Sequence, residues 1–275
     1  MSRISKCFAT LKQKKCGAFI PYLEAHDPDY QTSLSLLKAM PKAGADIIEI
    51  GMPFSDPMAD GSAVQKAAIR ALKAGATMKK TLQMVTEFRM ENQHTPLILM
   101  GYTNPIEYYG YEKFCQDAAK AGVDGLIIVD MPPEEIENIK PYAIKNQIDI
   151  IYLVAPTTSA DRLTTILKEA SGFIYYVSIT GTTGTSTATN ESLEKAIPMI
   201  KAASDLPIVI GFGLNTPEHT ANAAKIADGA VVGSALLKTL ESTLDSHNHA
   251  TQDTVTKVIE HTKCLADGAH SVLKQ

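Results

Sequence analysis

One glutamate of this sequence lies in a setting that favours acid–base chemistry. Glu49 belongs to the apolar run DIIEIG (46–51), whose β-branched residues predict a strand. Side chains alternate between the faces of a strand, so Ile48 and Ile50 share one face and Glu49 shares the other with Ile47. Burial of a carboxyl group there would raise its pKa, as a general acid or base near neutral pH requires. A buried glutamate satisfied by tyrosine or backbone donors is the alternative.

Two aspartates follow in a long loop, GMPFSDPMADGSAVQ (51–65). Asp56-Pro57 and Asp60-Gly61 are turn-favouring pairs, and we interpret Asp56 as a turn residue. The loop is long enough to bring Asp60 over a neighbouring site. The residue types leave open whether Asp60 does so or only holds a turn.

Three glycine-containing segments are candidates for binding a phosphate group: 180–187, 211–217 and 233–238. Backbone N–H groups converge on phosphates at glycine-rich loops and at helix N-termini. The glycines of any one segment could simply form a turn, but the three segments together favour a phosphate-bearing ligand. TGTTGTST (180–187) lacks apolar anchors and is interpreted as a lid that orders on ligand binding, with a merely flexible loop as the alternative.

Apolar runs alternating with stretches of helical spacing organise the whole chain. Strands separated by helices pair in parallel with right-handed crossovers. Eight such units predict an α/β protein with one (β/α)₈ TIM-barrel domain over residues 1–275. A doubly wound open sheet is the alternative, but no GxGxxG follows the first run. The predicted strands are 17–23, 46–51, 97–102, 125–130, 148–154, 173–179, 207–212 and 229–233.

In such a barrel the active site lies at the C-terminal ends of the strands, where Glu49 and the glycine segments would meet. Two additions to the barrel are expected. An N-terminal helix with Ile4, Phe8 and Leu11 on one face would pack across the barrel bottom, and GSALLK (233–238) would form a short phosphate-binding helix after the eighth strand. Helical patterns also lie at 64–74 and 78–92, and 244–253 is interpreted as a linker before the last helix.

Composition excludes several classes of function. The net charge of −4 comes without a basic stripe, and no window approaches the ~18 apolar residues of a membrane span. The first residues have a helical pattern rather than that of a signal peptide, so we expect a cytoplasmic protein. No strand run contains a lysine for a Schiff base, and His26 is the one histidine near a strand end, so we expect no metal site. The scattered cysteines favour reduced thiols: Cys7, Cys16, Cys115 and Cys264.

Several segments together resemble the tryptophan synthase alpha subunit family. They are GAFIPYLEAHDP (17–28), GADIIEIGMPFSDPMADG (44–61), YYVSITGTTG (175–184), GFGLNTPE (211–218) and GSALLK (233–238). The resemblance implies a lyase that cleaves indole-3-glycerol phosphate to indole and glyceraldehyde 3-phosphate, without a cofactor, in tryptophan biosynthesis. Two alternatives remain: another phosphate-binding-barrel isomerase or synthase, and a catalytically weak barrel that binds a ligand and regulates a partner.

The resemblance also implies roles for individual residues. Glu49 would move protons, and Asp60 would bind the indole N–H and stabilise the cationic ring. Thr183 would fold toward Asp60 when the lid closes. The indole pocket would be lined by Tyr22, Met100 and Tyr175, and the phosphate would be held by Gly184, Gly213, Gly233 and Ser234.

A partner is implied as well. The family works with a pyridoxal-phosphate-dependent beta subunit in an alpha2beta2 heterotetramer and delivers indole to it. The contact surface would include PFSDP (53–57), the Asn104-Pro105 loop and the loop 131–133. Apolar and proline residues around the barrel mouth suit an interface.

The chain departs from the family pattern P-[FY]-x-T-x-G-D-P. Glu24 replaces the threonine and His26 the glycine, while Ser62 replaces a common proline and is expected to loosen the Asp60 loop. A carboxylate near Glu49 would raise the pKa of one of the pair by like-charge repulsion, and His26 would offset that charge.

Overall fold

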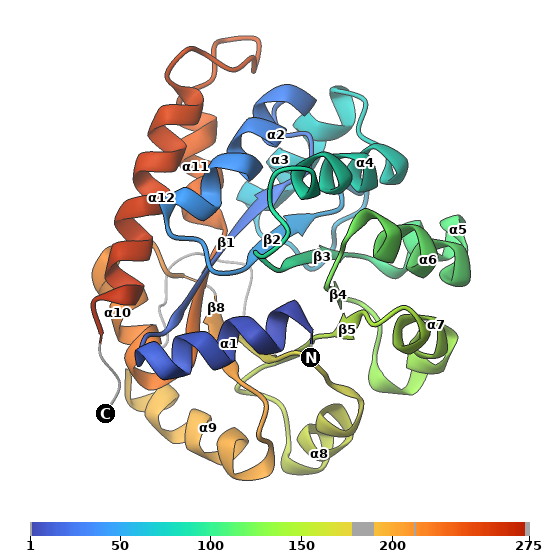
Figure 1. The fold of residues 1–275 in the computed structure, drawn as a ribbon, viewed down its shortest axis with the longest axis vertical. Coiled ribbons are helices and arrows are strands. Elements are labelled where there is room, and N and C mark those ends of the chain that lie inside the picture. The colour runs from blue at the N-terminus through green and yellow to red at the C-terminus, as the bar shows by residue number, and fades with distance from the viewer. Residues whose placement is uncertain (1, 178–189, 212, 273–275) are drawn as a thin grey trace.

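Strands form in each predicted apolar run, and they close into a parallel barrel (Figure 1). The computed structural model describes residues 2–177, 190–211 and 213–272. Within these ranges the strands are β1 (Ala18–Glu24), β2 (Ile48–Gly51), β3 (Leu97–Gly101), β4 (Gly125–Ile128), β5 (Asp149–Ile150), β6 (Tyr152–Val154), β7 (Ile174–Val177), β8 (Ile208–Gly211) and β9 (Gly229–Val232).

The neighbour order β5-β4-β3-β2-β1-β9-β8-β7-β6 shows how the barrel closes. β5 pairs with β4 and β6 pairs with β7, and both come from the predicted fifth run, interrupted only at Ile151. Because β5 and β6 are consecutive in the chain, the two ends of the sheet meet there. The predicted eight-unit barrel is confirmed, with its fifth strand divided in two.

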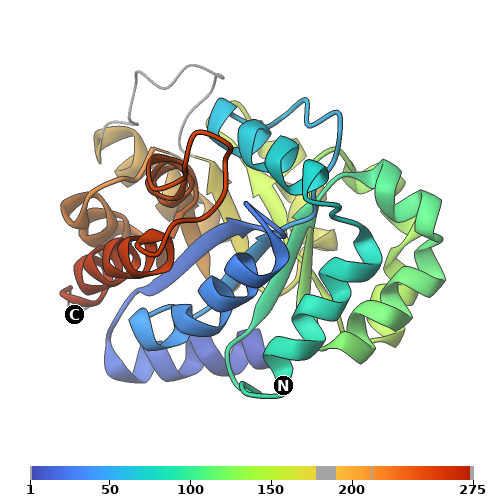
Figure 2. The same ribbon diagram turned by 90° about the horizontal axis from the view of Figure 1, so that it is seen from above.

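Helices separate successive strands, except β5 and β6, and lie outside them (Figure 2). The strands can therefore pair in parallel, because each crossover returns the chain to the same barrel end. The helices are α1 (Arg3–Lys14), α2 (Tyr30–Ala39), η1 (Met40–Ala43), α3 (Ser62–Lys73), α4 (Met78–Arg89), α5 (Thr103–Tyr109), α6 (Tyr111–Ala121), η2 (Pro133–Asn138), α7 (Lys140–Lys145), α8 (Ala160–Glu169), α9 (Asn190–Ala203), α10 (Pro217–Ile226), α11 (Ser234–Ser242) and α12 (Thr254–His270).

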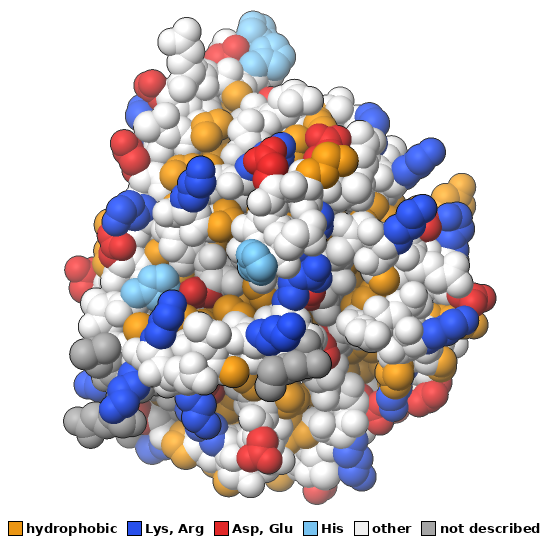
Figure 3. Space-filling view, viewed as in Figure 1, with side chains coloured by type: hydrophobic (Ala, Val, Ile, Leu, Met, Phe, Trp, Pro, Cys, Tyr) orange, Lys and Arg blue, Asp and Glu red, His pale blue; other side chains and the backbone are white. Residues whose placement is uncertain are grey.

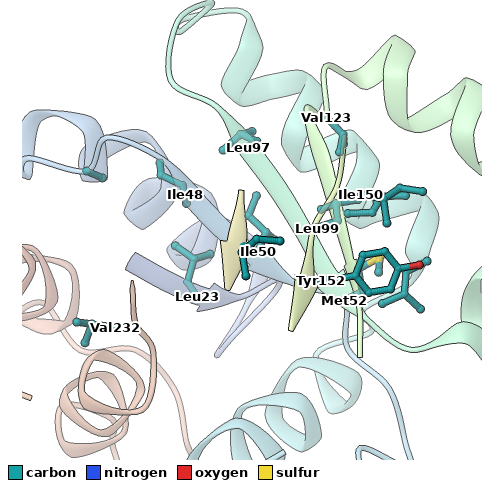
Figure 4. Packing of buried hydrophobic residues seen from close by; sticks show 14 of the residues in the cluster. Leu23, Ile48, Ile50, Met52, Leu97, Leu99, Val123, Ile150, Tyr152 and Val232 are labelled. Atoms are coloured by element: carbon teal, nitrogen blue, oxygen red, sulfur yellow. The ribbon is translucent and has the colours of Figure 1, made fainter. Parts of the chain in front are cut away.

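The outer hydrophobic core fills the space between strands and helices. Ile48 and Ile50 of β2 lie in it beside Leu97 and Leu99 of β3, as Figure 4 shows. These residues occupy alternate positions, as the strand pattern predicts. The other face of each strand is thereby directed into the barrel.

A second hydrophobic cluster fills the lower interior of the barrel. Ile47 contributes to it from the position just before β2, and Ile4, Phe8 and Leu11 contribute from α1. The predicted N-terminal helix is therefore present and covers the barrel end at which the strands begin (Figure 1). The opposite end, where the strands stop, is left for the βα loops and for Glu49.

Replacing Ile4 by alanine is expected to destabilise the fold by about 2–5 kcal/mol, because Ile4 is fully buried beneath the barrel and its truncation leaves a cavity. Denaturant unfolding monitored by circular dichroism measures this change. Lys6→Ala, on the exposed face of the same helix, is the matched control and should shift stability by less than about 0.5 kcal/mol. Equal effects of the two substitutions would contradict the packing described for α1.

Candidate active site

Glu49 lies inside the barrel near the C-terminal end of β2. Its register partners are Tyr22 of β1 and Ile98 of β3. The residue is 1% exposed, and its Oε1 atom has no hydrogen-bond partner among the described residues. A buried polar atom without a partner is costly, so an oxygen left in this state points to a ligand-binding role.

The surroundings of Glu49 shift its titration toward neutral pH. Burial raises the pKa of Glu49 to about 8, and the charge of Asp60 adds to the increase. A carboxyl group with a pKa of about 8 exchanges protons readily near neutral pH, so it can serve as both acid and base.

Asp60 is held over the barrel mouth by a tyrosine. The Tyr102 hydroxyl donates to Asp60 Oδ2 at 3.0 Å and accepts from the Ala59 N–H at 3.0 Å. Burial raises the pKa of Asp60, while the hydrogen bond from Tyr102 lowers it. The loop therefore does more than form a turn: it brings a second carboxylate close enough to influence Glu49.

Tyr102 was missed in the sequence, although it directly follows the last residue of β3. A position at the C-terminal rim of a barrel strand is the signal that could have identified it. A small pocket at this rim is lined by Tyr22, Glu24, Asp60, Met100 and Tyr102, among others.

The predicted indole-pocket residues surround this end of the barrel interior. Tyr22 and Tyr175 are each 6% exposed; burial raises the pKa of both hydroxyls, and the charge of Glu49 adds to the increase. Met100 packs against the lower interior cluster and against a second cluster that contains Tyr22. The structure thus brings Tyr22, Tyr175 and Met100 together around Glu49.

The helix after the last strand presents an uncapped N-terminus. Gly233 is the N-cap of α11, and no side-chain cap hydrogen bond forms at this end among the described residues. Ser234 is exposed, and Gly233 lies against Tyr22, since a β-carbon added at Gly233 would be 3.3 Å from Tyr22 Cβ. The first N–H groups of a helix lack intrahelical partners and bind anions. A ligand that contacts Tyr22 could therefore also reach the first N–H groups of α11.

Of the other residues predicted to contact the phosphate or the substrate, only Gly213 lies among the described residues. Gly213 is exposed and has a φ of +77°, a conformation that glycine adopts at low cost. Thr183 and Gly184 lie outside the described residues.

Comparison with known proteins identifies the family. A sequence model described as tryptophan synthase alpha chain matches residues 8–266. The tryptophan synthase alpha chain of Gluconacetobacter diazotrophicus is 58% identical over 265 residues, which cover 96% of this chain and 97% of that protein. The chain belongs to the tryptophan synthase alpha chain family. Its function is accordingly the lyase reaction of that family in tryptophan biosynthesis, the cleavage of indole-3-glycerol phosphate.

Solved structures of this family share the fold. The crystal structure of tryptophan synthase subunit alpha from Legionella pneumophila has a TM-score of 0.89 at 37% identity and covers 99% of this chain and 100% of that chain. The aminoacrylate-bound form of tryptophan synthase from M. tuberculosis gives a TM-score of 0.86 at 30% identity, with 98% and 100% coverage. The barrel and its added helices are therefore family features.

Glu24, which departs from the family pattern, is buried beside the pocket. The Tyr22 hydroxyl donates a hydrogen bond to Glu24 Oε2. The pKa of Glu24 is raised to about 8 by burial, the largest influence, and by the charges of Asp60 and Asp27, although the hydrogen bond from Tyr22 and the charge of Arg70 act in the opposite direction. The sequence predicted that repulsion between Glu24 and Glu49 raises the pKa of one of the pair. The carboxylate whose charge raises the pKa of both is instead Asp60.

His26 does not offset the charge of Glu24 as the sequence predicted. Its ring packs edge-on against Tyr30 with 5.0 Å between centroids, and burial and the charge of Lys80 lower its pKa. The cation near Glu24 is instead Arg70, whose Nε and Nη2 donate to the Asp27 carboxylate at 2.7 and 2.8 Å. His26 has a φ of +69°, which explains why glycine suits this position in the family.

Other kinds of site are not apparent in the described part of the chain. No three histidine, cysteine or acidic side chains gather there as metal ligands, and no helix among those residues is long and apolar enough to cross a membrane. Basic and acidic side chains are interspersed on the face shown in Figure 3.

Replacing Glu49 by glutamine is expected to stabilise the fold increasingly as pH rises. With a pKa of about 8, folded Glu49 keeps a proton that the unfolded chain releases above about pH 4.3. Wild-type stability therefore falls between about pH 4.3 and 8, and the variant lacks this loss. From pH 4 to pH 8.5, the difference in unfolding free energy between variant and wild type should widen by a few kcal/mol, in order of magnitude.

Urea unfolding at a series of pH values measures this difference. Glu107→Gln, at an exposed glutamate, is the control and should keep a constant difference from the wild type. A constant difference for Glu49→Gln as well would show that Glu49 ionises normally.

Proposed function

We propose that Glu49 carries the proton transfers of indole-3-glycerol phosphate cleavage and that Asp60 stabilises the cationic indole ring. The observation that carries this assignment is the buried, unpartnered Oε1 of Glu49 at the C-terminal end of a barrel strand. A single carboxyl group with a pKa of about 8 can deliver one proton and accept another in the same turnover.

The reaction requires both steps. Protonation of indole C3 makes the ring a cation, which can accept the electron pair of the bond between C3 and the side chain. Removal of the proton from the adjacent side-chain hydroxyl forms the aldehyde of glyceraldehyde 3-phosphate, and the electrons of the broken C–C bond restore neutral indole. Glu49 as acid and then base balances these two proton transfers.

Asp60 supplies the complementary charge. Its carboxylate would accept the indole N–H and lie close to the positive charge that develops on the ring. The Tyr102 hydroxyl fixes Asp60 Oδ2 before substrate arrives, so little reorganisation is needed. Such preorganised charge is most effective in a site that excludes water.

The remaining contacts orient the substrate. Tyr22, Met100 and Tyr175 would enclose the indole ring, while N–H groups of Gly213, Gly233 and Ser234 would bind the phosphate. The N-terminus of α11, which has no side-chain cap among the described residues, supports the last two assignments. The roles of Thr183 and Gly184 rest on the family resemblance. On this proposal the whole chain, residues 1–275, forms the one catalytic domain.

The chain would act beside a tryptophan synthase beta subunit in the cytoplasm and deliver indole to it. Large apolar side chains are exposed in segments close to the barrel mouth: Met58 is 74% exposed and Tyr108 is 96% exposed. Met58 belongs to the Asp60 loop, and Tyr108 lies on α5 after β3. Exposed apolar groups of this size suit a protein interface.

The wild-type chain is expected to cleave indole-3-glycerol phosphate slowly alone and faster with a beta subunit. Glu49→Gln and Asp60→Asn should each lower kcat by about 10²–10⁴-fold, since each removes a proton carrier or a stabilising charge. Release of indole, measured by absorbance or chromatography, reports the rate.

Asp205→Asn is the matched control, because Asp205 is an exposed aspartate before β8, at the barrel end opposite the proposed site, and it should remain within about two-fold of the wild type. Near-normal turnover in Glu49→Gln or Asp60→Asn would refute that residue's role. No wild-type turnover with or without the beta subunit would favour the regulatory alternative.

Ser234→Asp is expected to raise KM for the phosphorylated substrate by about ten-fold or more, with a smaller change in kcat. A carboxylate at the start of α11 would occupy the N–H groups and repel the phosphate. Initial-rate kinetics separate the two constants. Ser242→Asp, at the exposed far end of α11, should leave KM unchanged, and an equal rise in both variants would argue against a phosphate site at Ser234.

A further inference from the structure

Glu24 is a third buried carboxyl group beside the proposed catalytic pair. It is the last residue of β1 and is 3% exposed. In the β1–β2 register Glu24 pairs with Gly51, just as Tyr22 pairs with Glu49. Paired residues of parallel strands project to the same side, so Tyr22 and Glu24 point into the barrel with Glu49.

Gly51 makes room for a contact between Tyr22 and Glu24. A β-carbon at position 51 would collide with the Tyr22 hydroxyl and with Glu24 Oε2. The hydrogen bond from Tyr22 to Glu24 therefore occupies the volume that a side chain at position 51 would take. Two buried side chains from the same strand face are thus locked to each other at the rim of the pocket.

Tyr22 links this contact to both ends of the proposed substrate site. Its strand neighbour is Glu49, and its Cβ lies against Gly233, the N-cap of α11. A movement of the Tyr22 ring would disturb the indole pocket between the proton carrier and the phosphate-binding end. Whatever fixes the Tyr22 hydroxyl therefore fixes one wall of that pocket.

We propose that Glu24 is a positioning residue, which holds the Tyr22 ring through its hydroxyl and whose own charge sets the affinity of the indole pocket. This inference rests on the proposed function, since it assigns Tyr22 to the indole pocket. Glu24 acts through Tyr22 and through charge, and it transfers no proton to the substrate.

The groups that face Glu24 determine when it becomes charged. Burial is the largest influence and raises its pKa to about 8; Asp60 in the loop before α3 and Asp27 after β1 also raise it. The Tyr22 hydroxyl and Arg70 of α3 lower the pKa of Glu24. Near pH 7 the group is mostly protonated, and above pH 8 the pocket gains a negative charge.

Ionisation of Glu24 should weaken substrate binding. The charge on the buried carboxylate is weakly screened, so it repels the negatively charged phosphate of the substrate. The substrate phosphate is nearly fully ionised throughout this range, since its second pKa is about 6. A change of affinity between about pH 7.5 and 9 therefore reports on groups of the protein.

The test uses Glu49→Gln, in which turnover is blocked and Glu49 cannot titrate. Binding of intact indole-3-glycerol phosphate is measured by calorimetry at about pH 7.5 and at about pH 9. The affinity of this variant is expected to fall by up to about eight-fold, the limit for one group with a pKa of about 8. Glu49→Gln combined with Glu24→Gln should change by less than about two-fold, and any titration of Asp60 is common to both. Equal pH dependence in the two proteins would overturn the role of the charge.

A second measurement tests the contact with Tyr22. Glu24→Leu removes the hydrogen-bond acceptor and is expected to lower kcat/KM about ten-fold, chiefly by raising KM. Glu24→Gln keeps an acceptor and should recover most of this loss near pH 7. In a Tyr22→Phe background, Glu24→Leu should have little further effect, because the hydroxyl that Glu24 holds is already absent.

Full additivity of Tyr22→Phe and Glu24→Leu would overturn the positioning role. Thermal unfolding of each variant confirms that the protein assayed is folded. If Glu24→Leu does not fold, the pH-dependent binding measurements with Glu24→Gln still test the proposal. Failure of the wild type to cleave the substrate would instead refute the proposed function, so the two failures are distinguishable.

Discussion

Closure of the parallel barrel is the constraint on which the site depends. Once the strands form a ring, every second side chain must project into an interior of fixed volume. Isoleucines such as Ile47 and the apolar face of α1 fill the lower part of that interior. Glu49 occupies the next inward position on β2 above Ile47, with an oxygen that no described protein group satisfies. Its raised pKa follows from this geometry, because the same wall that excludes water also removes the hydration of the carboxylate.

The features predicted correctly from the sequence are those fixed by local pattern. The inward direction of Glu49 follows from the alternation of side chains over a few consecutive residues. The barrel follows from eight successive units, each recognisable from its own short apolar run and helical spacing. The interruption at Ile151 was not predictable, because it reflects a strand that pairs with β4 at its start and with β7 at its end. Asp60 could be placed only by the structure, since the Tyr102 hydroxyl that holds it comes from a different βα loop. Thr183 and Gly184 stay predictions.

The departures from the family pattern show how backbone conformation limits such reasoning. Glu24 and His26 are two positions apart, and a glutamate can carry a negative charge and a histidine a positive one, so the sequence suggested that the two charges offset each other. The positive φ of His26 turns its ring to Tyr30 instead, where burial disfavours the charged imidazole. A left-handed conformation at a non-glycine residue costs about 1 kcal/mol or more, and the buried packing against Tyr30 offsets part of it. Sequence spacing gave no indication of that turn.

Arg70, rather than His26, is the cation near Glu24. Its contacts hold the end of β1, α3 and α11 in fixed positions relative to one another. It belongs to α3, the helix entered from the Asp60 loop, and it binds the Asp27 carboxylate just beyond Glu24. Its Nη1 also lies 3.8 Å from Glu241 on α11, whose other end carries Ser234. Breaking a buried pair by removing one partner leaves an uncompensated charge, so this geometry resists distortion. One buried cation thereby joins the strand end that bears Glu24, the helix that follows Asp60, and the helix that begins at the proposed phosphate site.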